Sequence, residues 1–319
     1  MIDGQSNESF RTEILAYGAD AIAQAAACVL RGRPVAVPTE TVYGLAADAR
    51  DAAAVARIYA AKGRPDFNPL IVHVADLDAA EKLGVFDLTA RRLAATFWPG
   101  PLTIVVPRTA DCPVSSIATA GLDTIALRVP AHRAMRALLA ATGAPLAAPS
   151  ANASGRISPT RGEHVLVSLD GRIAMVIDDG PTGAGVESTI VRVTDGGIEI
   201  LRPGPVTAAR LHEASGLDVT GRKEAGVVAP GMLASHYAPG KPVRLNATAF
   251  GADEFGIGFG GLAGDYQLSA EGDPVAAAAR LFDALHAGAA SAKAKIAVAA
   301  IPAEGLGAAI NDRLARAAV

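Results

Sequence analysis

The chain has 319 residues, a length that predicts two domains, and half of its residues are apolar. Its formal net charge of −3 argues against a broad nucleic-acid-binding face, although a local basic cleft remains compatible with it. No apolar run reaches the roughly 18 residues of a membrane span, and the N-terminus lacks a secretory pattern, so we expect a cytoplasmic protein without membrane contact. Two cysteines, Cys28 and Cys112, are too few for a disulfide framework or a zinc knuckle.

Short apolar strands alternate with helical patterns along the first two thirds of the chain, which is typical of an α/β fold with a mainly parallel or mixed sheet. Helices are expected at 21–32, 51–63, 88–98, 132–143 and 207–215. Strands are expected at 34–38, 70–75, 102–107, 124–130, 145–150, 174–180, 188–193 and 198–203. In the second helix Asp51 is a plausible N-cap and Gly63 a C-terminal stop. We place the first domain at 1–212.

Residues 213–241 carry glycine, proline and polar residues without sustained periodicity, which predicts a linker that covers the active site. Beyond the linker, strands are expected at 242–247, 254–260 and 295–302, and helices at 273–288 and 307–318. The region 242–319 is therefore predicted to form a small second α/β domain.

The common nucleotide and hydrolase templates are absent from this sequence. It contains no G-x-x-x-x-G-K-[ST] loop, no G-x-G-x-x-G after a strand, no H-E-x-x-H and no G-x-S-x-G. The six histidines are scattered, which disfavours a metal site built from histidines. Taken alone, His73 in the strand at 70–75 indicates a structural histidine.

Polar residues gather where predicted strands and helices end, and in open α/β sheets ligands bind at the ends of strands. Thr39 and Thr41 suit either a small polar ligand or a hydroxyl-rich turn. Lys62 and Arg64 bracket Gly63. Two cations beside a glycine turn suit a triphosphate, but they are also common in a solvated loop at the end of a helix.

Three further positions stand out. Ser150 and Asn152 follow the strand at 145–150, where small hydroxyl and amide groups suit phosphate and adenine contacts as well as plain turns. Ser188 begins a strand, and Arg202 precedes a Pro-Gly turn. Arg128 lies inside an apolar strand and needs a buried partner or an anionic ligand, because an unpaired buried charge costs several kcal/mol.

Seven motifs, in this order, resemble the threonylcarbamoyl-AMP synthase family: VPTETVYGL, KGRPDFNPLIVHV, FWPGPLTIVV, ALRVPAH, APSANASGR, ESTIV and LRPGP. SHYAPGKP in the linker and GLGAAINDRLARAA near the end are similar to the longer, two-domain members, so the resemblance covers about residues 12–319. It implies a YrdC-like twisted mixed sheet with helices, plus a small Rossmann-like C-terminal α/β domain joined by a linker.

The resemblance implies a nucleotidyltransferase that condenses L-threonine, bicarbonate and ATP into threonylcarbamoyl-adenylate and pyrophosphate. This reaction is the first step of threonylcarbamoyladenosine modification of tRNA. For threonine, the resemblance implies contacts at Thr41, His73, Arg128, Ala148 and Ser188. For the nucleotide, it implies contacts at Lys62, Arg64, Asn68, Thr124, Ser150, Asn152, Ser158, Arg202 and Tyr237. Lys62 and Arg64 are the expected catalytic residues, and Tyr237 in the SHYAP segment is expected to fold over the nucleotide.

Mg²⁺ is expected to accompany ATP, with unassigned ligands, and no tightly bound organic cofactor is expected. The implied partners are the three substrates and downstream tRNA threonylcarbamoyl-transferase proteins, with no more than weak binding of tRNA itself. Arg161 and Gly162 stand where the family more often has small polar residues, which leaves the contacts of the 158–162 loop open.

Two alternatives remain. One is a non-catalytic relative that binds RNA on the same concave face. The other is a carbamoyl-transfer module of the hydrogenase-maturation type, which shares the fold but is expected to carry acylphosphatase-like and zinc-finger segments that are not found in this sequence.

Overall fold

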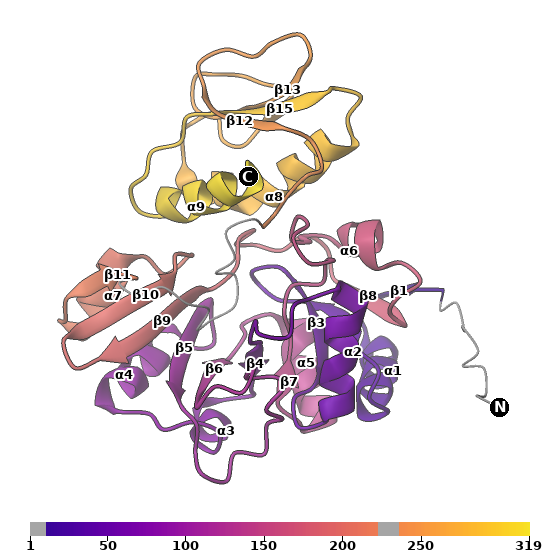
Figure 1. The fold of residues 1–319 in the computed structure, drawn as a ribbon, viewed down its shortest axis with the longest axis vertical. Helices are drawn as coiled ribbons and strands as arrows, with labels where there is room; N and C mark the ends of the chain where they lie inside the picture. Colours follow the sequence, from indigo (N-terminus) through magenta and orange to yellow (C-terminus); the bar gives the residue numbers. More distant parts are fainter. Residues whose placement is uncertain (1–10, 223–235) are drawn as a thin grey trace.

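The computed structural model describes residues 11–222 and 236–319. Figure 1 shows a larger body built on a broad twisted sheet and a smaller body above it, formed by the C-terminal part of the chain. Residues 223–235 of the expected linker at 213–241 lie outside the described residues, and its first part contains the short strand β11 (Val219–Gly221). Among the described residues no helix is long and apolar enough to cross a membrane.

The larger body holds an 11-stranded mixed sheet in the order β1-β8-β2-β3-β7-β4-β6-β5-β9-β10-β11. Its other strands are β1 (Glu13–Ala16), β2 (Val35–Pro38), β3 (Tyr43–Asp48), β4 (Ile71–His73), β5 (Leu102–Pro107), β6 (Thr124–Arg128), β7 (Leu146–Ala147), β8 (Met175–Asp178), β9 (Thr189–Thr194) and β10 (Gly197–Arg202). The helices are α1 (Ala19–Leu30), α2 (Ala52–Lys62), α3 (Leu77–Glu81), α4 (Leu88–Phe97), α5 (Arg133–Thr142), α6 (Gly162–Leu169) and α7 (Ala208–Ser215). The predicted twisted mixed α/β sheet is confirmed.

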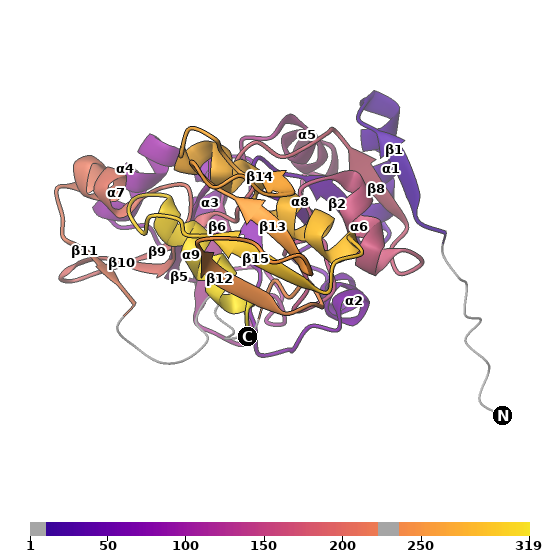
Figure 2. The ribbon, with the colours of Figure 1, turned by 90° about the horizontal axis from the view of Figure 1, so that it is seen from above.

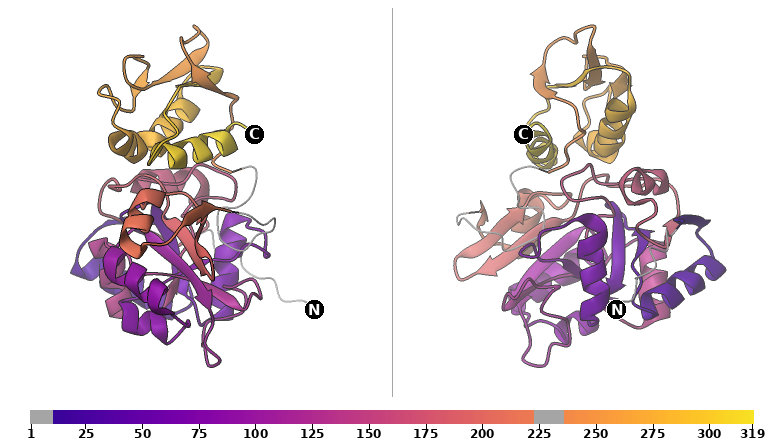
Figure 3. Two further views of the ribbon diagram at one scale, coloured as in Figure 1. Left: turned by 90° about the vertical axis from the view of Figure 1, so that its left-hand side faces the viewer. Right: turned by 45° about the vertical axis from the view of Figure 1, so that its right-hand side comes forward.

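The smaller body holds a four-stranded parallel sheet in the order β12-β15-β13-β14. Its strands are β12 (Val243–Ala247), β13 (Glu254–Gly258), β14 (Tyr266–Gln267) and β15 (Lys295–Ala299), and its helices are α8 (Pro274–Ala290) and α9 (Gly307–Ala317). Both helices lie between this sheet and the larger body (Figure 3). Seen from above, the smaller body covers the middle of the large sheet (Figure 2).

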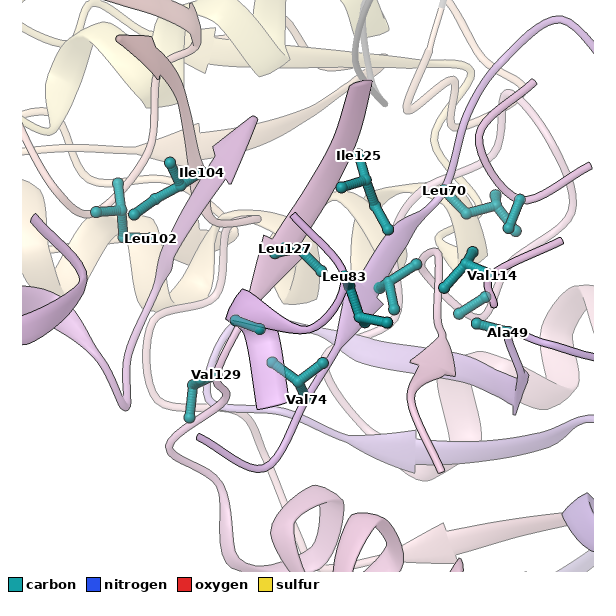
Figure 4. Close-up of a cluster of buried hydrophobic side chains, with 14 of the residues drawn as sticks. Ala49, Leu70, Val74, Leu83, Leu102, Ile104, Val114, Ile125, Leu127 and Val129 are labelled. Carbon is teal, nitrogen blue, oxygen red and sulfur yellow. The ribbon is translucent and has the colours of Figure 1, made fainter. Parts of the chain in front are cut away.

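The large sheet is buried on both faces, because alternate residues of a strand point to opposite sides. In β2, Val35 and Val37 join α1 and α5 in one cluster, whereas Ala36 belongs to a second cluster with α2 and α4. The second cluster continues through β5 and β6, where Leu102 and Leu127 are fully buried. Figure 4 shows part of this cluster. The outer helices therefore fix the strands that position the site.

Helix α2 begins and ends where its sequence predicts. The Asp51 carboxylate accepts hydrogen bonds from Ala53 N and Ala54 N, which pairs two amides of the first turn. Gly63 ends the helix with φ 58°, a left-handed conformation that glycine adopts without strain. Lys62 is therefore the last helical residue, and Arg64 follows after a sharp turn.

Two features of the predicted strands need correction. The strand expected at 145–150 contains only Leu146 and Ala147, because Pro145 and Pro149 have no amide hydrogen for the ladder. Strands β1, β3, β11 and β14 were not among the expected elements. Of these, β3 pairs antiparallel with β2 in the interior of the sheet. Its residues are almost all buried, so they lack the alternation of apolar and polar residues by which a half-buried strand is recognised.

The two bodies share a hydrophobic cluster. Val42, Ile157 and Val186 of the larger body pack with residues of α8 and α9 such as Phe282. Gly185 lies so close to α8 that an added Cβ would stand 2.3 Å from Ala278 O. Only a residue without a side chain permits this approach.

Candidate functional site

Successive side chains of a strand point to opposite faces of the sheet, and in the central strands this places polar side chains on the face that α4 and α7 do not cover. In β4 and β6, Val72 and Leu127 enter the core cluster, whereas Ile71 and Ala126 point to the opposite face. His73 and Arg128 follow two residues after Ile71 and Ala126, and they are paired across the two strands. Both therefore project toward the cavity between the sheet and the smaller body, and both line it.

Arg128 is buried, and each nitrogen of its guanidinium group faces an acceptor. Nε donates to Gly100 O at 3.2 Å, Nη1 donates to Thr41 Oγ1 at 3.0 Å, and Nη2 lies 2.7 Å from Glu40 Oε1. Burial disfavours the ionised form of Glu40, but Arg128 outweighs it and lowers the pKa of that carboxyl group. Of the two predicted solutions, a buried partner or an anionic ligand, the structure shows a partly buried partner, Glu40, which helps to hold the guanidinium group in one orientation.

His73 is 2% exposed, and neither of its ring nitrogens has a hydrogen-bond partner of acceptable geometry among the described residues. Burial and the nearby positive charge of Arg128 lower its pKa to about 3. The ring is therefore neutral at physiological pH, with one nitrogen able to donate and the other able to accept. A buried, unsatisfied imidazole that lines a cavity suits a polar ligand.

Arg64 lines the loop side of the same cavity, and Lys62 lies behind it, bonded to the backbone of the lining residue Ser150. Lys62 Nζ donates to Ser150 O at 2.5 Å and also to Asn152 O, and burial lowers its pKa well below the usual value. Arg64 donates to the carbonyl oxygens of Asn68 at 3.1 Å and Pro69 at 2.9 Å, and burial lowers its pKa to about 10. Among the described residues neither cation has a carboxylate within salt-bridge distance, so both suit an anionic ligand.

A third arginine comes from the end of β10. Arg202 Nε donates to Ser188 O, and its Nη2 donates to Ser188 Oγ, both at 3.0 Å. The same hydroxyl lies 2.8 Å from Thr103 Oγ1 of β5. Burial lowers the pKa of Arg202 to about 10. These bonds fix the Ser188 hydroxyl group at the cavity wall.

Glu187 is the single carboxylate among the described residues that line the cavity. Its Oε1 accepts from Ser158 Oγ at 2.6 Å, and its Oε2 lies 3.0 Å from Arg313 Nε of α9. Burial opposes its ionisation, yet Arg313 and Arg202 together bring its pKa down to about 2. The carboxylate is thus ionised and held by a residue of the smaller body.

Two residues of the SHYAP segment, His236 and Tyr237, line the cavity. Tyr237 is 1% exposed, has φ 65° and stacks on Phe282 of α8, with ring centroids 5.2 Å apart. His236 N donates to Arg316 O of the smaller body, and Ala238 N donates to Gly155 O of the larger one. Residues 236–238 are thereby bonded to both bodies, and the Tyr237 side chain lies between α8 and the cavity.

The structure brings most of the predicted site residues to one cavity. Those that line it are Thr41, Arg64, His73, Arg128, Ala148, Ser150, Ser188, Arg202 and Tyr237. Four others lie behind the lining: Lys62 is hydrogen-bonded to Ser150, and Asn68 to Arg64. Asn152 is hydrogen-bonded to Lys62, and Ser158 to Glu187. Thr124 is separate, because it begins β6 and lies about 13 Å along that strand from Arg128. Its nucleotide contact stays a prediction.

Sequence reasoning missed Glu40, Glu187, His236 and Arg313. Glu40 and Glu187 stand directly beside predicted site residues, so their neighbours could have signalled them. His236 likewise precedes the predicted Tyr237, whereas Arg313 has no such neighbour. Arg161, which departs from the family pattern, contacts the smaller body: its Nε donates to Asp283 Oδ1 of α8 at 2.8 Å.

Comparisons with known proteins agree on both parts of the chain. A family model described as Telomere recombination matches residues 27–204, and one described as Threonylcarbamoyl-AMP synthase, C-terminal domain, matches residues 206–319. Threonylcarbamoyl-AMP synthase of Bacillus subtilis is 46% identical over 242 residues, which are 73% of this chain and 69% of that protein. The protein of that name from Pyrococcus abyssi is 44% identical over 69% of this chain and 66% of its own length.

Solved structures extend the likeness to the whole fold. The crystal structure of P. abyssi Sua5 complexed with L-threonine has a TM-score of 0.86 and 34% identity, and the match covers 96% of this chain and 97% of that one. Full-length HypF, in a phosphate- and nucleotide-bound form, has a TM-score of 0.52 and 19% identity over 58% of this chain and 30% of its own. The HypF match shows a shared fold alone.

Proposed function

Because the chain belongs to the threonylcarbamoyl-AMP synthase family, we propose that it makes threonylcarbamoyl-AMP and pyrophosphate from L-threonine, bicarbonate and ATP. One observation carries the proposal. A single cavity joins an oriented arginine and a neutral imidazole, Arg128 and His73, to buried cations that include Arg64 and Arg202. The first pair suits an amino acid, and the cations suit a polyphosphate.

Threonine binds at Arg128 and His73. The guanidinium group donates hydrogen bonds to the carboxylate of the amino acid, while Thr41 and Ser188 supply hydroxyl groups. Neutral His73 hydrogen-bonds the threonine hydroxyl group, because one of its nitrogens can accept. Ile71 and Val42 give the cavity an apolar wall for the methyl group. The loss of one methyl group from the ligand, as in serine, should weaken recognition about 10- to 200-fold.

ATP binds with its phosphates at Lys62, Arg64 and Arg202, next to the loop that carries Ser150 and Asn152. These cations are fixed before the ligand arrives, so they stabilise developing charge without reorganising. Mg²⁺ enters as the complex with ATP. Glu187 is already engaged by Ser158 and Arg313, and no group of three acidic, histidine or cysteine residues among the described ones forms a metal cage. Mg²⁺ commonly keeps water and substrate phosphates as ligands.

The chemistry requires two bond-forming steps. The neutral amine of threonine attacks the carbon of CO₂ and releases a proton, or it attacks the carbon of bicarbonate, whose hydroxide leaves with the amine proton as water. Either route gives the carbamate. A carbamate oxygen then bonds to the α-phosphorus of ATP while the bond from that phosphorus to the bridging oxygen breaks. Pyrophosphate leaves with the electron pair. The contribution of the chain is to position the reactants and neutralise their charge, with Lys62 and Arg64 next to the triphosphate.

The test is release of pyrophosphate from ATP in bicarbonate buffer with threonine, with serine or without an amino acid. Threonine-dependent release, with mass-spectrometric detection of the adenylate, is the expected result. Folded protein that binds ATP but releases no pyrophosphate under any condition would favour the non-catalytic RNA-binding alternative, which a gel-shift assay with tRNA tests directly. The product is then consumed by proteins that transfer the threonylcarbamoyl group to tRNA.

A further inference from the structure

We propose that Arg313, on α9 of the smaller body, is a positioning residue of the nucleotide site: it holds and neutralises Glu187 so that the cavity accepts a polyphosphate. This inference rests on the proposed function, because it concerns the affinity for ATP. It assigns to the smaller body an electrostatic role in the site.

The contact between Arg313 and Glu187 joins residues 126 positions apart. The Arg313 side chain is 0% exposed, and that of Glu187 is 8% exposed. Nε of the arginine lies 3.0 Å from Oε2 of the glutamate, and the other carboxylate oxygen accepts from Ser158 Oγ. Both oxygens of the carboxylate are thereby fixed, so Glu187 cannot turn away from the cavity without losing buried bonds.

The charge of Glu187 would oppose ATP binding if Arg313 were absent. Glu187 lines the same cavity as Arg64 and Arg202, and it interacts electrostatically with Lys62. A carboxylate among these cations reduces their attraction for phosphate and repels the phosphate oxygens directly. The positive charge of Arg313 offsets the negative charge of Glu187 from behind the cavity wall, since Arg313 is not among the lining residues.

Arg313 also contacts the other elements that border the nucleotide site. Its Nη1 donates to Pro203 O, which directly follows Arg202, and its guanidinium carbon lies 6.0 Å from the centroid of the Tyr237 ring. A purely mechanical brace would use these contacts without regard to charge. The electrostatic proposal differs, because it predicts that loss of Arg313 matters only while Glu187 is negative.

The experiment measures binding of MgATP, AMP and adenosine by calorimetry to the full chain and to the variants Arg313→Met, Glu187→Gln and the double variant. Arg313→Met should weaken ATP binding by about tenfold or more, AMP binding less, and adenosine binding least, since repulsion grows with the charge of the ligand. The double variant should regain most of the ATP affinity. Arg280→Met is the control in the smaller body, because that exposed side chain on α8 donates to Gln267 O and does not line the cavity.

The outcomes separate the possible explanations. Equal weakening of all three ligands, or no recovery in the double variant, would mean a mechanical brace and overturn the proposal. If Arg313→Met does not fold, Glu187→Gln still decides, because removing the negative charge should leave ATP affinity equal or tighter, and tenfold weaker binding in a folded variant would contradict us. Wild-type protein that binds no ATP would instead count against the proposed function.

Discussion

Replacing Arg128 with lysine should raise the KM for threonine roughly 10- to 150-fold, because lysine keeps the charge but loses the planar fork. Three separate acceptors surround the guanidinium group, at Gly100, Thr41 and Glu40. A single ammonium group cannot reach all three and also grip a carboxylate at two points. The arginine therefore cannot be exchanged without loss of orientation.

The magnitude follows from one lost charge-assisted hydrogen bond to the substrate. Such a bond contributes about 1.5–3 kcal/mol, and each 1.4 kcal/mol corresponds to about a tenfold change in affinity. The effect should appear in the KM for threonine and leave the KM for ATP unchanged, because the cations at Lys62 and Arg64 belong to the loop side of the cavity.

The assay is pyrophosphate release with threonine varied at saturating ATP, supported by calorimetric titration with threonine. Arg50→Lys is a suitable control, since Arg50 forms a half-exposed pair with Asp48 and surface pairs contribute little. If the threonine KM of Arg128→Lys stays within about threefold of wild type, the free-energy change is smaller than the loss of one charge-assisted hydrogen bond. That result would refute the assignment of Arg128 to the threonine carboxylate.

Three further predictions concern the loop cations, the turn between them and the histidines. Lys62→Met should lower the rate of pyrophosphate release about 100- to 1,000-fold at saturating substrates, and a rate close to wild type would remove Lys62 from the catalytic group. Gly63→Ala should destabilise the fold by about 1 kcal/mol in urea unfolding and Gly63→Asn by less, because φ is 58° and no neighbour crowds the site of the new Cβ; equal effects of alanine and asparagine would contradict this cause. Burial above all lowers the pKa of four histidines, to about 3 for His73, His164 and His236 and about 4 for His286. Below about pH 6.5 the unfolded chain therefore binds more protons than the folded one. The urea concentration at the midpoint of unfolding should fall as the pH is lowered from about 7 to about 4.5, and a midpoint independent of pH would refute this prediction.

The elements that the sequence predicts best carry their own local signals. Asp51 and Gly63 mark both ends of α2, so the positions of Lys62 and Arg64 relative to that helix follow from local chemistry. Strand β3 and the short helix α6 lack comparable signals. Arg161, the N-cap residue of α6, makes no side-chain capping bond, and tertiary contacts support the helix instead.

The site likewise has features that follow from local sequence and features that depend on tertiary packing. The period of two in β4 and β6 is local, and it places His73 and Arg128 on one face once the core face is known. The partners of these residues are not local. Nothing near Arg313 in the chain indicates that it meets Glu187, because that meeting depends on how the two bodies pack. Glu40 is a different case, since it lies beside Thr41 but its role depends on β6.

The shared cluster around Val42, Ile157 and Val186 means that the domain border in the sequence is not a border in the hydrophobic core. Each body supplies part of the interior of the other. A recombinant fragment that ended before α8 would present those three side chains to water and would leave Glu187 without its arginine. The two halves match separate family models, but they share a hydrophobic interior. A recombinant protein that keeps the cavity unaltered must therefore extend from the large sheet to α9.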